Sequence, residues 1–162
     1  MNPVTSYQIN FDELSNEDII SFRIHIENQF KIRGIKFEVG EIGETVAIDF
    51  YNNTTGLSNL QKAPRGTKNV DALSRDGERY SIKTIKNGNK TGTVYPDRDD
   101  KEKQLFEYLL LVQLSSDYTL KAMHRFTWKQ FLKVRQWDTT MNAWYVSKTI
   151  KALKEAECIH GK

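Results

Sequence analysis

Apolar residues in the first third of the chain recur with the spacing of amphipathic helices. One stripe lies between Ser15, a helix-capping residue type with an acid three positions later, and Gly34, a common helix stop. A second stripe predicts a helix over residues 38–52. The stripes consist of Ile19, Phe22, Ile26 and Phe30, and of Val39, Ile42, Val46 and Phe50.

The pattern then changes to that of β-strands. The Asp-Gly pair in residues 75–78 predicts a hairpin turn, because it supplies a positive φ at little cost. The nearly continuous apolar run 109–112 is typical of a strand covered on both faces. The predicted elements are strands over 69–74, 79–86, 106–114 and 119–126, a helix over 128–135 capped by Thr127, a short strand over 142–146 and a helix over 148–158.

Helices at both ends of a run of strands predict an α/β or α+β sandwich, a central mixed sheet of about four to five strands flanked by helices. A length of 162 residues predicts one domain over residues 1–162. A hydrophobic fraction of 38%, with 8 Phe, 7 Tyr and 3 Trp, excludes a chain disordered throughout. The single Cys158 excludes an internal disulfide and a cysteine-rich zinc site. Because we find no apolar run long enough to span a membrane and no signal peptide, we expect a cytoplasmic chain with no membrane partner.

Charge is distributed unevenly along the chain. Residues 1–59 hold 4 Lys or Arg and 9 Asp or Glu, whereas residues 60–162 hold 20 and 12. A basic remainder predicts a positive face that attracts polyanions, and DNA is the expected partner. No phosphate-loop or dinucleotide fingerprint is present, so we expect no nucleotide cofactor. The predicted DNA-contacting residues are Arg65, Lys68, Lys86, Lys90, Lys129, Lys133 and Arg135.

The predicted hairpin brings polar residues together. A three-residue loop over 75–77, with glycine in the left-handed region, sets Asp71 opposite Ser81, whereas a two-residue loop sets it opposite Ile82. We favour the three-residue loop or a bulge, because Ser81 and Lys83 then share a face with Asp71. A carboxylate beside a lysine suits metal-dependent phosphodiester hydrolysis, with Asp71 binding Mg²⁺, Lys83 positioning the nucleophile and the Ile82 carbonyl as a further oxygen ligand.

The segment Gly66-Thr67-Lys68-Asn69-Val70-Asp71-Ala72, followed by Glu78-Arg79-Tyr80-Ser81-Ile82-Lys83-Thr84, resembles the core of the PD-(D/E)xK nuclease superfamily. It is most similar to the compact type II restriction endonucleases, over roughly residues 38–126. The resemblance implies a restriction-endonuclease-like fold and a Mg²⁺ cofactor, with Mn²⁺ as a substitute. It also implies that Asp71 is the central metal ligand, that Lys83 is the catalytic lysine, and that Glu44 or else Glu41 is a helix carboxylate of the site.

The sequence departs from the family at Ser81, where an acid is usual and a hydroxyl is a weak Mg²⁺ ligand. Glu44 supplies a second negative charge, and Glu78 and Asp49 are further candidates for it. The resulting hypothesis is a type II restriction enzyme that cuts duplex DNA. A homodimer is expected, because one small domain does not easily hold both strands. The alternatives are a weak or inactive nuclease-fold module that binds DNA or a protein partner, and a structural domain in which the motif is coincidental.

Overall fold

The computed structural model describes residues 9–161, which form two compact units that divide after Phe37 and are described separately. The first unit holds a 3-10 turn over Phe11–Glu13 and helix α1 over Asn16–Arg33. Ser15 and Asp18 form a reciprocal capping box, and Gly34 ends the helix at φ 65°. The predicted first helix is therefore confirmed together with both of its end signals.

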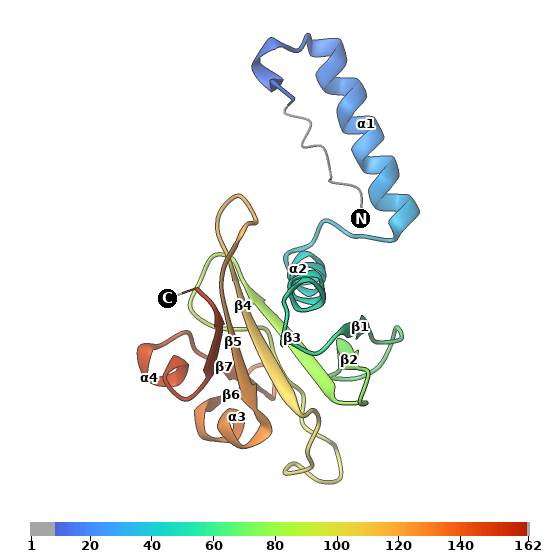
Figure 1. Ribbon diagram of the computed structural model, residues 1–162. Coiled ribbons are helices and arrows are strands. Elements are labelled where there is room, and N and C mark those ends of the chain that lie inside the picture. The colour runs from blue at the N-terminus through green and yellow to red at the C-terminus, as the bar shows by residue number, and fades with distance from the viewer. Residues whose placement is uncertain (1–8, 162) are drawn as a thin grey trace. The chain divides into compact units, whose positions relative to one another are not determined.

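The second unit is built on a six-stranded mixed sheet with the order β1-β2-β3-β4-β5-β8 (Figure 1). Every neighbouring pair is antiparallel except β3 and β4, which are parallel. The connection between β3 and β4 is irregular and contains no helix among these described residues. The strands are β1 (Leu60–Lys62), β2 (Ala72–Ser74), β3 (Arg79–Ile85), β4 (Tyr108–Leu114), β5 (Leu120–Thr127) and β8 (Glu157–His160).

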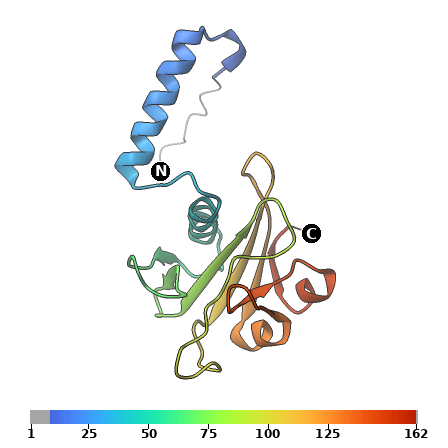
Figure 2. The ribbon, with the colours of Figure 1, turned by 180° about the vertical axis from the view of Figure 1, so that it is seen from behind.

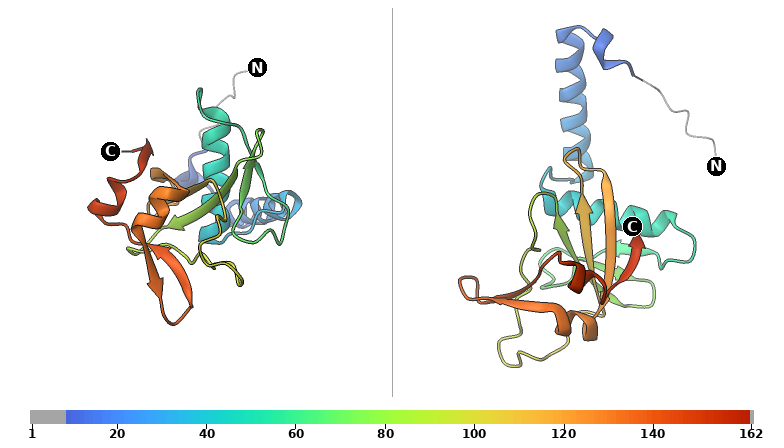
Figure 3. Two further views of the ribbon diagram at one scale, coloured as in Figure 1. Left: turned by 90° about the horizontal axis from the view of Figure 1, so that it is seen from below. Right: turned by 90° about the vertical axis from the view of Figure 1, so that its left-hand side faces the viewer.

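Helices cover both faces of this sheet (Figures 1 and 2). Helix α2 (Val39–Asn53) packs on one face over a core that includes Tyr80 and Ile82. Helices α3 (Trp128–Val134) and α4 (Ile150–Leu153) lie on the other face, over a core that includes Phe126. Strands β6 (Arg135–Asp138) and β7 (Ala143–Val146) form a separate hairpin that projects from the sheet (Figure 3). The architecture is mixed α and β, with four α-helices in the part of the chain that is described.

The structure confirms the predicted helix over 38–52, the three long strands β3, β4 and β5, the capped helix α3 and the short strand β7. The predicted last helix is wrong, because only Ile150–Leu153 is helical and Glu157–His160 forms β8 along the edge of β5. Strand β8 forms hydrogen bonds with the backbone groups along the edge of β5. A longer last helix would have left those groups unpaired. Sequence patterns also missed β1 and β6, and β2 begins at Ala72 rather than at 69. Within residues 9–161, no helix combines the length and apolar character needed to cross a membrane.

Candidate active site

The site begins at the β2–β3 hairpin, whose turn sets the pairing of the two strands. The Ser74 amide bonds to the Glu78 carbonyl at 2.9 Å across the loop, and Gly77 adopts φ 82°. Ala72 pairs with Tyr80, and the Asp71 amide donates to the Tyr80 carbonyl at 2.8 Å. The predicted three-residue loop is therefore confirmed, and it puts Asp71 beside Ser81.

The carboxylate of Asp71 is the centre of the site. Its Oδ2 accepts from the Ile82 amide at 2.6 Å and from the Ser81 hydroxyl at 3.4 Å, and it lies 3.8 Å from the Lys83 Nζ. The side chains of Asp71 and Lys83 are 22% and 17% exposed, so both are sheltered yet reachable. The N–H and C=O of one strand residue point to the same edge, so the Ile82 carbonyl also faces the Asp71 edge.

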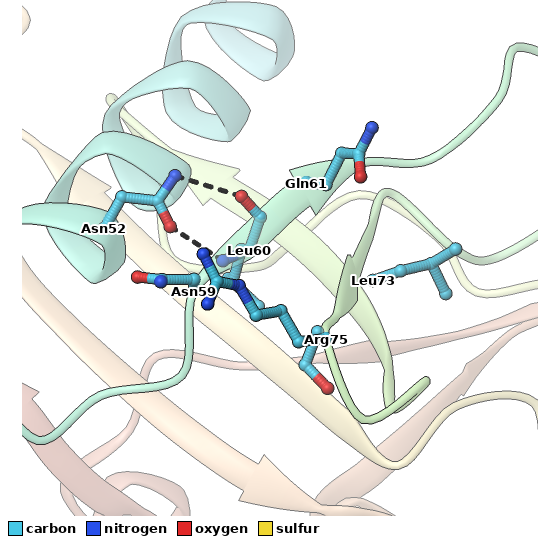
Figure 4. A pocket seen from close by; sticks show the side chains of 7 residues that line it. Asn52, Asn59, Leu60, Gln61, Leu73 and Arg75 are labelled. Atoms are coloured by element: carbon cyan, nitrogen blue, oxygen red, sulfur yellow. Dashed lines mark hydrogen bonds between the residues drawn. The ribbon is translucent and has the colours of Figure 1, made fainter.

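Helix α2 brings two more carboxylates towards this edge. Its Gly43 lies against Thr84 of β3, where an added Cβ would sit 2.7 Å from the Thr84 Cβ and closer still to its hydroxyl oxygen. Only glycine permits this approach, and Glu44 follows it directly in the helix. At the other end of α2, the Asn52 side chain accepts from the Leu60 amide at 2.7 Å and donates to the Leu60 carbonyl at 3.0 Å (Figure 4). These two bonds fix β1 against α2.

Strand β1 adds Lys62, which sequence reasoning missed. Its Nζ lies 2.6 Å from Glu41 Oε2 and 3.1 Å from Glu44 Oε2. Burial raises the pKa of Glu44, the hydrogen bond from Lys62 opposes the rise, and the negative charge of Asp71 adds to it. Burial opposes the charged form of Lys62, but hydrogen bonds to Glu41 and Glu44 raise its pKa overall. Strand β1 was not expected, so no sequence signal placed this lysine near the motif.

The four candidates for the second carboxylate occupy different places. Glu44 is the best placed, because its side chain is 19% exposed and feels the charge of Asp71. Glu41 lies at the same helix face and is held by Lys62. Glu78 is bound in the hairpin turn, where it accepts from Ser74 at 3.2 Å, and Asp49 is exposed. The assignment of Glu44 stays a prediction, now with a geometric argument for it.

The donor set suits a hard divalent cation. Asp71 and Glu44 offer carboxylates, and Ser81 and the Ile82 backbone offer neutral oxygens. Mg²⁺ is commonly held by one or two carboxylates together with water and substrate phosphate. Residues 9–161 contain no cluster of three His, Cys, Asp or Glu side chains that could hold a metal ion.

Most of the predicted DNA-contacting side chains already have partners. Lys90 pairs with Asp138, Lys133 with Glu155, and Lys86 lies 3.5 Å from the Tyr118 ring centroid. Arg135 is bound to Glu102 and packs over the Trp144 ring at 4.0 Å, so it braces the β6–β7 hairpin.

Arg65 and Lys129 are exposed and have no ion-pair partner among the described residues. Lys68 is also exposed, and its Nζ lies 3.5 Å from the Pro96 carbonyl oxygen. That these three residues, and the group as a whole, contact DNA stays a prediction.

No protein-family model matches this sequence, and a comparison with curated proteins finds no match.

Proposed function

We propose that the chain is a metal-dependent DNA endonuclease of restriction-endonuclease-like fold, acting on phosphodiester bonds at the Asp71 edge. The observation that carries the proposal is the contact between Asp71 and Lys83 at a sheltered edge of the sheet, 3.8 Å between the carboxylate and the ammonium. The negative charge of Asp71 also contributes to the raised pKa of Glu44, after burial. The parallel β3–β4 pair beside the β2–β3 hairpin is consistent with that fold.

In this proposal Asp71 and Glu44 would hold Mg²⁺, or Mn²⁺, together with the Ile82 carbonyl. When bound, the ion would polarise the phosphate and lower the pKa of a water molecule. Lys83 stands beside Asp71, where its ammonium can orient the attacking water and offset the negative charge that grows on the phosphate. Lys62 holds Glu44 in place before substrate arrives.

Helix α1 supports the further proposal that the enzyme is a homodimer. Ile20, Ile24 and Ile32 are each more than half exposed, and α1 has no buried residue. Its first turn is acidic and its last turn is basic. A second copy of α1 running in the opposite direction would cover Ile20 and Ile24, which are four residues apart on one helix face, and would match these charges.

A non-cutting DNA-binding module is the second candidate, and Ser81 is the observation that favours it. Ser81 is fully buried and neutral, so one carboxylate fewer than the family pattern faces the metal. Such a module binds DNA in a salt-dependent manner without cleaving it.

Cleavage of plasmid and phage DNA with Mg²⁺ or Mn²⁺ tests the proposal. Asp71→Asn keeps an oxygen for the Ile82 amide but removes the charge, and Lys83→Gln removes the ammonium. Each should lower the cleavage rate at least about 100-fold. Asp76→Asn, in the exposed turn of the same hairpin, should cleave like the wild type.

Cleavage that survives both site variants would contradict this assignment of the site. No cleavage with either metal, together with salt-dependent DNA binding, would support the non-cutting module instead.

A further inference from the structure

A groove of about 540 Å³ lies outside the residues of the candidate active site. Three segments that are far apart in the sequence form it: the loop before Asp71, the connection between β3 and β4, and the turn of the β6–β7 hairpin. We call it the strand groove; its lining residues are Lys68, Tyr95, Pro96, Asp97, Arg98, Lys101, Trp137 and Asn142.

The walls of the strand groove are fixed by backbone contacts. The Asn69 side chain donates to the Tyr95 carbonyl at 2.9 Å, which ties the first segment to the second. Val94 and Trp144 exchange two backbone hydrogen bonds of 2.7 and 2.9 Å, which tie the second segment to the hairpin. The groove is therefore formed before any ligand arrives, which lowers the entropic cost of binding.

Two aromatic side chains in this groove are exposed to solvent. Tyr95 is 40% exposed and Trp137 is 36% exposed. Trp137 is held edge-on by Trp144 at a centroid distance of 4.6 Å, and Arg135 covers the Trp144 ring. The tryptophan is thus oriented, and it remains partly exposed with the Lys101 Nζ 5.9 Å from its ring centroid.

The charge of the strand groove is positive. Lys68, Arg98 and Lys101 line it, and its single acid, Asp97, pairs with Lys103 at 3.1 Å. Cations that follow a backbone, interleaved with open aromatic rings, characterise surfaces that bind single-stranded nucleic acid. In a duplex the faces of the bases are stacked on one another and cannot reach such rings.

We propose that the strand groove binds an unpaired segment of a nucleic-acid strand, whose bases stack on its two aromatic rings and whose phosphates contact its three cations. Lys68 precedes Asp71 by three residues, so their backbones are at most about 11 Å apart. At about 3.4 Å per nucleotide, a bound segment leads to the Asp71 edge within a few nucleotides. The inference deepens the proposed function, because it names a substrate with an unpaired stretch beside the cut. It rests on the proposed function only for the position of the cut.

Binding is measured by fluorescence anisotropy in EDTA, with a single-stranded oligodeoxynucleotide of about 12 nucleotides and a blunt hairpin duplex as probes. The wild type should bind the single strand at least about fivefold more tightly than the duplex. Tyr95→Ala should weaken single-strand binding about 5- to 150-fold and change duplex binding less than about twofold. The matched control is Tyr145→Ala, because Tyr145 is only partly buried and lies on the other face of the same hairpin from Trp137.

Two further readouts report on the stacked base and on the phosphates. Single strands should quench tryptophan emission in the wild type but not in Trp137→Phe. Lys101→Ala should reduce the slope of log affinity against log salt by about 0.7, whereas Lys151→Ala, at an exposed site on α4, should leave it unchanged.

Equal affinity for single strand and duplex would overturn the inference, as would equal effects of Tyr95→Ala and Tyr145→Ala. Because no metal is present, the inference and the proposed function fail separately. A chain that binds single strands in this way but cuts nothing would refute only the nuclease.

Discussion

The contact between Gly43 and Thr84 decides how closely α2 approaches the sheet, and Gly43→Ala tests it. An alanine Cβ would lie 2.7 Å from Thr84 Cβ and 2.6 Å from Thr84 Cγ2, whereas carbon atoms in contact stand about 3.5–4.0 Å apart. The Thr84 Cβ is attached directly to the backbone of β3. A rotamer change cannot remove the clash, so the helix must move.

The magnitude follows from two opposing terms. Overpacking a well-packed site costs about 1–3 kcal/mol. Replacing a glycine within a helix by alanine returns at most about 1 kcal/mol. The expected net loss is about 1–2 kcal/mol, or a Tm lower by about 2–8 °C for a chain of this size. Gly40→Ala in the same helix is the matched control: no atom lies within 4 Å of its added Cβ, so it should raise Tm by about 1–4 °C.

Thermal and urea unfolding of the two variants measure this difference. A double-mutant cycle with Thr84→Gly, which removes every atom that the new Cβ meets at Thr84, should show a favourable coupling of at least about 1 kcal/mol. Stabilisation by both alanine variants, or a coupling near zero, would refute the close approach. It would also remove one argument for bringing Glu44 towards the Asp71 edge.

Three further predictions concern the charges of the chain and its association. Ser81→Glu puts a second buried carboxylate beside Asp71, so stability in EDTA should fall by about 1–3 kcal/mol and Mg²⁺ or Mn²⁺ should raise Tm more than in the wild type. The hydrogen bond from Arg79 lowers the pKa of Glu107, so Glu107→Gln should cost about 1 kcal/mol at pH 7, and urea titrations should show that this deficit shrinks as the pH falls below about 4.5. Ile24→Glu on α1 should convert a dimer to a monomer in sedimentation without changing the circular dichroism, and an unchanged mass would contradict the dimer proposal.

Local signals in the sequence predicted those parts of the fold that depend on neighbouring residues. The Ser15 cap and the Gly34 stop placed α1, and Gly77 in its left-handed conformation set the register that brings Asp71 to Ser81. Each of these features is decided within about ten residues of chain. Turn chemistry and capping were therefore sufficient to predict them.

Elements that depend on distant partners were missed or wrongly assigned. Strand β1 has three residues, too few for a periodic pattern, and it forms by pairing with β2, where Leu60 lies opposite Ser74. The segment Glu157–His160 becomes a strand because β5 offers it an open edge. The sequence did not indicate Lys62 as a site residue, because its position depends on where β1 packs.

The balance of charge at the Asp71 edge connects these observations. Glu41, Glu44 and Asp71 are offset by Lys62 and Lys83, so the edge is nearly neutral before any ion binds. An acid at position 81 would have added a fourth carboxylate to a buried place with no cation to offset it. Ser81 offers no negative charge to a divalent cation, and Glu44 is already paired with Lys62. A divalent cation that binds at this edge must therefore compete with Lys62 for Glu44. We expect such an ion to bind strongly only when the substrate phosphate supplies the missing negative charge, which couples metal binding to DNA binding.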